Sequence, residues 1–144
     1  MQQVKAVCLN SNKGPKIQVD CIELLENWGV IGDYHAATGS NRQVSLLLDN
    51  EIEKIIQAGY TPGIGAFGEN IIISGIEIGA ISIGDTFVFN ESIELLVTII
   101  GKECHTPCII QQTTGKCIMP ETGIFCKVLK GGVIKNGDWI NHCK

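Results

Sequence analysis

Short runs of β-branched and apolar residues, separated by glycine next to aspartate or asparagine, dominate this sequence of 144 residues. There are 17 glycines, and they recur between these runs. Glycine adopts positive φ without strain, and Asp or Asn side chains hydrogen-bond nearby backbone amides, so such pairs mark tight turns. The layout predicts a mostly β chain, folded as a barrel or sandwich rather than as a helical domain.

The expected strands lie between these turn signals along the whole chain. They cover 4–10, 17–25, 43–48, 71–73, 85–89, 93–100, 125–129 and 139–141. The strand at 43–48 is apolar enough to be buried on both faces. No linker, repeat or low-complexity tract interrupts the pattern, so we expect a single domain over 1–144.

One clear helix is expected near 49–59. Asp49 or Asn50 can cap its start, and Gly59 can end it. Three isoleucines between them fall at helical spacing (Ile52, Ile55 and Ile56). A second, short helix is expected near 105–112, with Pro107 in its first turn.

Charge and hydropathy exclude several classes of protein. The net charge of −4 argues against a nucleic-acid surface, which needs a clustered basic face. No apolar stretch approaches the roughly 20 residues that cross a bilayer, and the N-terminus lacks the layout of a secretory signal. We therefore expect a cytoplasmic protein with no membrane and no nucleic-acid partner.

Seven cysteines are present, an odd number that cannot pair completely within one chain. Three of them fall in expected strands and are interpreted as small buried residues (Cys8, Cys21 and Cys126). Cys143 lies in the tail and is interpreted as incidental. The remaining three lie in or near turns and are candidates for chemistry (Cys104, Cys108 and Cys117).

Cys104 has the most informative surroundings of the three. A β-branched strand run ends just before it, Gly101 precedes it, and Pro107 follows, so the backbone turns there. The thiolate is the nucleophilic and metal-binding form of cysteine, and nearby cations favour it. Lys102 and His105 could supply that positive charge, as could the start of a helix at His105.

Several segments along the chain carry a family resemblance in the same order as they occur here. They are GVIGDYH (29–35), RQVSLL (42–47), AFGENI (66–71), IGD (83–85), LVT (96–98) and GIF with VLKGG (123–132). With Cys104 after the LVT strand, this series resembles the MOSC domain, named for the C-terminal part of molybdenum cofactor sulfurase. The resemblance implies a single-domain, β-barrel-like fold in a short stand-alone member.

The resemblance also implies a role in sulfur or molybdenum-cofactor chemistry. Cys104 matches the family's recurrent cysteine, which would carry sulfur as a persulfide or bind molybdenum. The implied cofactor-binding residues are Arg42, His35, Glu69, Asn70, Lys102 and His105. Implied partners are a sulfur donor protein or a cofactor-assembly enzyme, and a small anionic pterin or sulfur species. Pyridoxal phosphate is not assigned, because the chain shows no lysine placed for a Schiff base.

Two departures from the family pattern leave the reaction open. Gly101-Lys102-Glu103 stands before the cysteine where the family often has an arginine-proline pair, and the 144 residues contain no desulfurase domain. The chain is therefore either a sulfur transferase or molybdenum-cofactor-dependent enzyme, or a carrier that performs no turnover.

Each candidate also has a structural interpretation. Arg42, the single arginine, could bind an anion bidentately or pair with a surface carboxylate. His35 could bind a ligand or contact backbone carbonyls, and Glu69 with Asn70 could bind a ligand edge or satisfy turn amides. Cys108, as a secondary thiol, could resolve a persulfide or pack among apolar neighbours.

Two alternative functions follow from the same residues. The first is a zinc site built from soft ligands, Cys104, His105, Cys108 and Cys117, although their spacing is poor for one tetrahedral ion. The second is a non-catalytic module that presents its cleft to a partner in cofactor assembly, with idle thiols.

Overall fold

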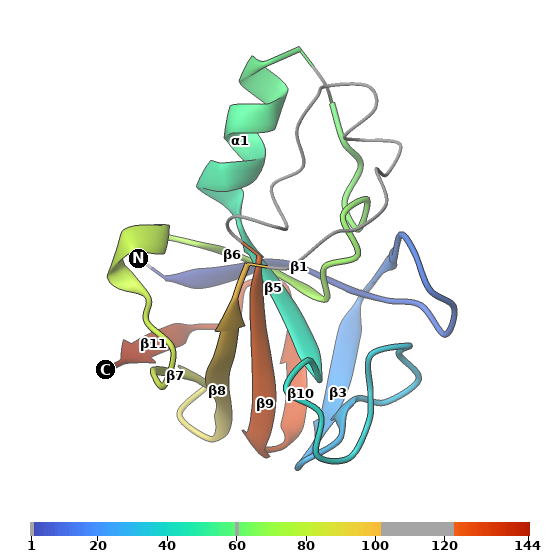
Figure 1. Ribbon diagram of the computed structural model, residues 1–144, viewed down its shortest axis with the longest axis vertical. Helices are drawn as coiled ribbons and strands as arrows, with labels where there is room; N and C mark the ends of the chain where they lie inside the picture. Colours follow the sequence, from blue (N-terminus) through green and yellow to red (C-terminus); the bar gives the residue numbers. More distant parts are fainter. Residues whose placement is uncertain (1, 60, 102–122) are drawn as a thin grey trace.

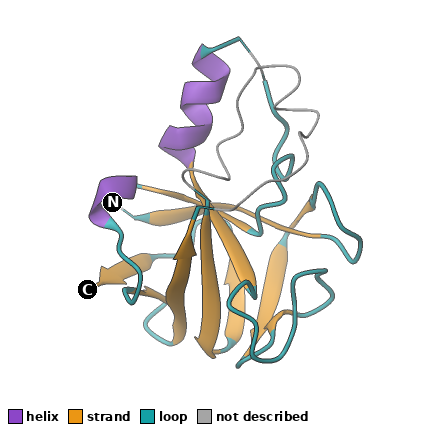
Figure 2. Ribbon diagram, viewed as in Figure 1, coloured by secondary structure: helices purple, strands orange, loops and turns teal. Residues whose placement is uncertain are grey.

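The computed structural model describes residues 2–59, 61–101 and 123–144. Its strands are β1 (Gln3–Leu9), β2 (Ile17–Val19), β3 (Cys21–Leu25), β4 (Gly29–Val30), β5 (Val44–Leu48), β6 (Ile71–Ser74), β7 (Thr86–Phe89), β8 (Ile93–Ile100), β9 (Ile124–Lys130), β10 (Gly132–Lys135) and β11 (Ile140–Cys143). Its helices are α1 (Asp49–Gln57) and the 3-10 turn η1 (Ile78–Ala80). The expected mostly β fold is confirmed, and Figure 2 shows strands and loops making up most of the chain.

The strands form two sheets. The larger has eight strands in the order β11-β7-β8-β9-β5-β6-β1-β2, and the smaller has the order β10-β3-β4. Figure 1 shows the larger sheet curling into a half-barrel, with β1 and β6 crossing the direction of β8 and β9. The two sheets enclose the main apolar core, which includes Ile22, Leu46, Phe87 and Ile134.

β5 and β6 pair in parallel, unlike the other strand pairs in the described ranges. A parallel pair needs a crossover connection, and α1 lies in that connection. The helix stands at one end of the sheet in Figure 1. Its Ile55 packs with Leu47 and Phe125 in a second, smaller apolar cluster. The helix therefore helps to bury Phe125 of β9.

Several expected elements are confirmed at close to the expected boundaries. All five residues of β5 are buried, as its continuous apolar run predicts. β7 and β8 form the expected hairpin, with Asn90 and Glu91 both at positive φ in its turn. Asp85 and Asp138 close their expected turns by accepting hydrogen bonds from the amides of Ser82 and Lys135.

The start of the helix differs from the expectation. The residue at the N-cap is Leu48, and no side chain caps the first turn. Asn50 instead donates its side-chain amide to the carbonyl oxygen of Ile76 at 2.9 Å. The predicted cap at Asp49 or Asn50 is therefore wrong, because the chain enters the helix directly from buried β5. The short helix expected near 105–112 lies outside the described residues.

Among the described helices, none combines the length and apolar character needed to cross a membrane.

Candidate functional site

Asp33 is the centre of a buried polar cluster in the turn that follows β4. Its carboxylate accepts hydrogen bonds from the backbone amides of Asn10 and His35, each at 3.0 Å. Lys16 donates from Nζ to both carboxylate oxygens, at 2.8 and 3.0 Å. The side chains of Lys16 and Asp33 are only 1% and 0% exposed. Charged groups are rarely this buried unless they are paired, and here every partner is a hydrogen-bond donor to Asp33.

The hydrogen bonds of this cluster set the charge of Asp33. Burial alone would raise the pKa of its carboxyl. The hydrogen bonds from the Lys16 ammonium and from the backbone amides of Asn10 and His35 outweigh burial and hold the pKa of Asp33 well below the ordinary value. Asp33 is therefore a carboxylate at neutral pH and a matched counter-ion for the Lys16 ammonium.

His35 stands between this buried cluster and the surface. Its Nδ1 lies 3.0 Å from Lys16 Nζ, and its side chain is 22% exposed. The ring meets Tyr34 and Phe125 edge-on, with centroid distances of 5.6 and 6.3 Å. These two contacts restrain the ring, while part of the side chain stays open to solvent.

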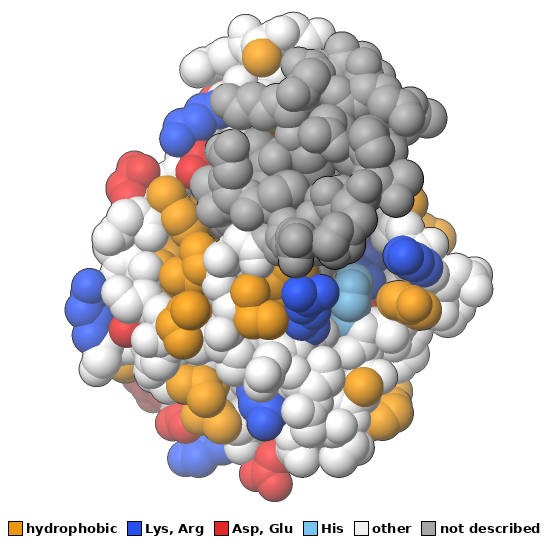
Figure 3. All heavy atoms as spheres, viewed as in Figure 1, with side chains coloured by type: hydrophobic (Ala, Val, Ile, Leu, Met, Phe, Trp, Pro, Cys, Tyr) orange, Lys and Arg blue, Asp and Glu red, His pale blue; other side chains and the backbone are white. Residues whose placement is uncertain are grey.

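Phe125 also contacts the exposed side chain of Arg42. The Arg42 guanidinium carbon lies 5.6 Å from the centre of the Phe125 ring, which is a cation–π distance. The same ring therefore contacts both His35 and Arg42. On the face drawn in Figure 3, a histidine side chain has cationic side chains on both sides of it.

The position of Arg42 is set by its neighbours in the chain. Gln43 is fully buried, donates to the carbonyl oxygen of Ala37 at 3.1 Å and accepts from the amide of Val128 at 3.0 Å. The hydroxyl of Thr98 contacts the carbonyl oxygens of Asn41 and Phe125. These bonds tie the loop before β5 to β8 and β9, so Arg42 is held over Phe125 from a well-anchored backbone.

Glu69 lies in the interior beside this site. Its carboxylate accepts from the backbone amides of Gly65 at 3.0 Å and Phe67 at 3.1 Å. Burial raises the pKa of Glu69, and these hydrogen bonds oppose the rise only in part. The amide of Lys16 donates to the Gly65 carbonyl at 2.8 Å, so the loop organised by Glu69 supports the backbone of Lys16.

Asn70 is likewise committed to the fold. Its Oδ1 accepts from the Ser45 amide at 3.0 Å, and its Nδ2 donates to the Cys8 carbonyl at 3.1 Å. Asn70 thus bridges β1 and β5 at the point where β6 begins. Both Glu69 and Asn70 are 0% exposed.

The structure brings together two of the predicted site residues, His35 and Arg42, around Phe125. Glu69 and Asn70 lie in the interior, where their side chains form hydrogen bonds with backbone groups of the protein. The other predicted residues lie outside the described residues (Lys102, Cys104, His105 and Cys108), as does Cys117 of the zinc alternative. Their roles remain predictions.

The segment that carries Cys104 begins and ends beside Phe125. The last residues of β8 pair with the first of β9, with Ile99 opposite Phe125, and the Gly101 amide donates to the Gly123 carbonyl. The described chain therefore leaves and re-enters the sheet next to Phe125, the ring that contacts His35 and Arg42.

The other thiols follow the expectation with one exception. Cys8 and Cys126 are buried, and burial raises the pKa of Cys8 to about 12, with the nearby charge of Glu69 adding to the rise. Burial also raises the pKa of Cys126. Cys21 is exposed, so its predicted burial is wrong. It begins β3 with its side chain on the outer face of the smaller sheet, where alternate residues point to solvent.

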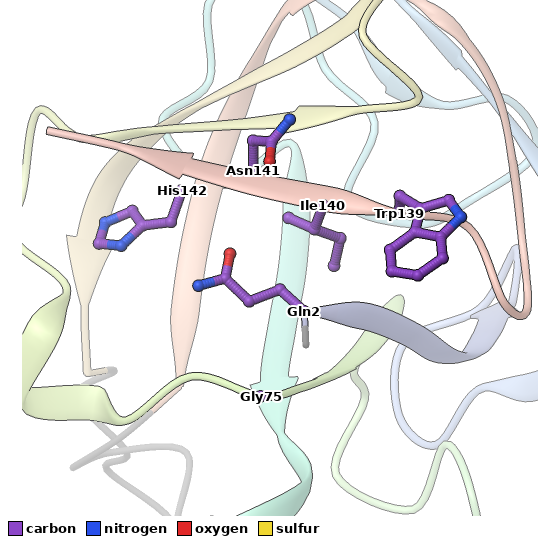
Figure 4. A pocket seen from close by; sticks show the side chains of 6 residues that line it. All are labelled: Gln2, Gly75, Trp139, Ile140, Asn141 and His142. Atoms are coloured by element: carbon purple, nitrogen blue, oxygen red, sulfur yellow. The ribbon is translucent and has the colours of Figure 1, made fainter.

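A separate hollow of about 430 Å³ lies at the edge strand β11. It is lined by Gln2, Gly75, Trp139, Ile140, Asn141 and His142. Figure 4 shows Gln2, Ile140 and Trp139 extending into the same space and Asn141 pointing away. Its one titratable side chain, His142, already has Asp85 Oδ2 at 2.7 Å from Nε2. None of the predicted site residues within the described ranges lines this hollow, and its described lining offers no thiol or hydroxyl nucleophile.

Sequence reasoning missed Lys16 and Phe125. Lys16 follows a turn of Asn, Ser, Gly and Pro, where a lysine is normally solvated, and only the distant Asp33 explains its burial. Phe125 belongs to the resembling segment 123–125, which signalled the site without assigning the ring a role.

Together, these features define a β half-barrel domain with a cationic site against one aromatic ring. The MOSC domain profile matches residues 33–141. The chain therefore belongs to the MOSC domain family, and the predicted resemblance is confirmed.

Solved structures show the same fold. The YuaD protein from Bacillus subtilis is 20% identical, with a TM-score of 0.80 over 100% of this chain and 97% of that one. YiiM from Geobacillus stearothermophilus is 18% identical, with a TM-score of 0.74 over 100% of this chain and 76% of that one. YiiM from Escherichia coli is 18% identical, with a TM-score of 0.62 over 99% and 70%. No curated protein matches the sequence.

Proposed function

We propose that this MOSC protein binds an anionic pterin cofactor or carries sulfane sulfur, with Cys104 as metal ligand or sulfur acceptor. The observation that supports this proposal most is the contact of one aromatic ring, Phe125, with both His35 and Arg42. Phe125 is the second residue of β9, the first described strand after the segment that contains Cys104.

The described residues fit the anionic part of molybdenum cofactor. Arg42 presents a planar guanidinium that matches a phosphate bidentately, and its cation–π contact with Phe125 holds it at the site. His35 adds a ring nitrogen beside it. When bound, the cofactor would supply a redox-active metal or a terminal sulfur, and Cys104 would offer the thiolate that such a metal prefers. Glu69 and Asn70 would contribute by holding the backbone beneath the site.

Sulfur transfer to Cys104 would be an exchange reaction. The Cys104 thiolate attacks the terminal sulfur of a donor persulfide, the donor S–S bond breaks, and the donor leaves as a thiolate. Cys104 then holds the persulfide, and no external oxidant or reductant is consumed. Lys102 and His105, the expected cations near the thiol, would favour the attacking thiolate.

The experiment compares the wild type with Cys104→Ser and with Cys21→Ser, the latter a control for an exposed thiol. Each protein is incubated with a persulfide donor and measured by intact mass, and pterin retained after purification is measured by fluorescence after oxidation. We expect a gain of one sulfur atom or retained pterin in the wild type and in Cys21→Ser only. Neither signal in the wild type, or equal signals in Cys104→Ser, would contradict the proposal.

Metal analysis tests the zinc alternative. Stoichiometric zinc in protein purified without chelator, lost in Cys104→Ser and in Cys108→Ser, would favour a zinc site over a sulfur or molybdenum site.

A further inference from the structure

Lys16 has a contact pattern that determines the protonation of its neighbour His35. Its ammonium carries three N–H donors and no acceptor. Three acceptor positions surround Nζ: the two oxygens of Asp33 at 2.8 and 3.0 Å, and His35 Nδ1 at 3.0 Å. One donor is therefore available for each partner.

Since the ammonium can only donate, His35 Nδ1 must accept. A proton on Nδ1 would set an N–H against an N–H at 3.0 Å and would leave one lysine donor buried without a partner, which costs free energy. The other acceptor near Nδ1 is Asp33 Oδ2 at 3.6 Å, beyond ordinary hydrogen-bond length. The nearer contact thus favours an unprotonated Nδ1.

The rest of the cluster leaves His35 little freedom to escape this arrangement. Its own amide donates to Asp33 Oδ2 at 3.0 Å, so the backbone and the ring are held by the same buried pair. The ring also makes edge-on contacts with Tyr34 and Phe125. A ring held in this way cannot exchange its nitrogens by flipping without breaking the contact with Lys16.

We infer that Lys16 and Asp33 are positioning residues that keep His35 neutral, with its proton on Nε2, so that the ring offers a hydrogen-bond donor to the site. Arg42, over the same Phe125 ring, is also only a donor. The site is therefore suited to ligands with acceptor oxygens, such as a phosphate or an oxo-anion, and unsuited to cations. This inference deepens the proposed function and rests on it for the identity of the ligand, but the tautomer itself is a property of the free protein.

The test is nitrogen NMR of protein labelled with ¹⁵N-histidine at neutral pH, without ligand. The His35 signals are assigned by their loss in His35→Gln. We expect Nδ1 to have the pyridine-like shift of an unprotonated nitrogen and Nε2 the pyrrole-like shift of an N–H. An imidazolium, or a ring protonated on Nδ1, would overturn the inference whatever the variants do.

Two lysine variants test the role of Lys16 itself. Lys16→Met removes the donor to Nδ1, so the share of the ring protonated on Nδ1 should rise from a minor fraction to a comparable one. Lys13→Met, in the same loop but exposed, should leave the His35 pattern unchanged. An unchanged tautomer in a folded Lys16→Met protein would show that Lys16 does not set it.

Inorganic phosphate serves as the ligand probe. Adding phosphate should shift the Nε2 resonance of His35 in the wild type and in Lys13→Met. The affinity for phosphate should be several-fold weaker in Lys16→Met. No shift of Nε2 at saturating phosphate would contradict the donor role. If the tautomer and the phosphate response are found but Cys104 takes up neither sulfur nor pterin, the proposed function fails while this inference stands.

Discussion

The Nζ atom of Lys16 lies 2.8 and 3.0 Å from the two carboxylate oxygens of Asp33, and both side chains are withdrawn from solvent. This pair joins the loop between β1 and β2 to the turn after β4. Because Asp33 also accepts from the amides of Asn10 and His35, the pair organises the backbone on which the candidate site stands. Its energetics can therefore be tested independently of any ligand.

Removing one member of this pair should destabilise the protein strongly. Asp33→Asn leaves a buried ammonium without its counter-charge, and such a loss costs about 3–5 kcal/mol. The free energy of unfolding from urea titration checks this value. Lys135→Met is the matched control, since it breaks an ion pair whose lysine is 66% exposed and should cost less than about 1 kcal/mol. Equal losses of unfolding free energy in the two variants would show that the buried pair stabilises the protein no more than the exposed pair does.

Glu69 should give the stability a pH dependence opposite in sign to that of Asp33. Its folded-state pKa is raised above the ordinary value of 4.5 by burial, so the folded state binds its proton more tightly than the unfolded state. Its contribution to stability is therefore largest below pH 4.5 and is lost as pH rises through the raised pKa. The carboxyl of Asp33, with its lowered pKa, contributes stability above its ordinary value and loses it as pH falls.

Glu69→Gln removes the titration of Glu69 and isolates its effect. The difference in unfolding free energy, wild type minus Glu69→Gln, should fall as pH is raised from 4.5 toward neutrality. Denaturant titrations across this range measure it. A difference that is constant with pH would mean that the folded protein does not raise the pKa of Glu69.

Gly65 should tolerate no side chain. It has φ +88°, and an added Cβ would come 2.0 Å from the carbonyl oxygen of Lys16, which is backbone and cannot yield without moving the loop. Gly65→Ala should therefore cost more than the roughly 1–2 kcal/mol that left-handed backbone alone imposes on alanine. Gly59→Ala isolates the backbone term, since Gly59 has φ +100° and open space around it. Gly63→Ala has neither the steric clash nor the left-handed backbone, so its free energy of unfolding should be close to that of the wild type. Similar losses of stability in Gly65→Ala and Gly59→Ala would contradict the steric argument.

Local patterns in the sequence predicted the strands well because strand burial follows directly from apolar runs and turn residues. The buried run of β5 and the hairpin of β7 and β8 are of this kind. The helix cap was mispredicted because Asn50 finds a better partner in Ile76, 26 positions away, and sequence spacing carries no information on that contact.

The site was only partly predictable for the same reason. His35 and Arg42 were found through their family segments, but Lys16 meets Asp33 across 17 positions, and only the tertiary fold brings Phe125 against both His35 and Arg42. The burial of Glu69 and Asn70 likewise depends on loops that fold around them. Such contacts belong to the tertiary fold and not to any local pattern.

Thiol burial should appear as selective alkylation. In native protein treated with iodoacetamide, Cys21 and Cys143 should react because they are exposed, while Cys8 and Cys126 should stay unmodified. Burial removes access, and it also raises the pKa of Cys8 to about 12, so that little thiolate forms. Peptide mass mapping after a short reaction measures each site, with denatured protein as the control in which all four react. Early labelling of Cys126 in native protein would contradict the described packing of β9.

Arg42 should bind anions through its shape as well as its charge. Arg42→Lys keeps the positive charge but loses both the fork of donors and the guanidinium contact with Phe125. We expect phosphate or molybdate affinity, measured by calorimetry, to fall by about tenfold, which corresponds to the loss of one charge-assisted hydrogen bond.

Since Arg42 is exposed, the unfolding free energy of Arg42→Lys should change by no more than about 0.5 kcal/mol. Lys127→Met removes a positive charge from the same strand as Phe125 while leaving Arg42 in place, so it shows how much affinity depends on net charge alone. If Arg42→Lys binds anions as tightly as the wild type, the guanidinium acts only as a point charge, and its placement over Phe125 has no part in recognition.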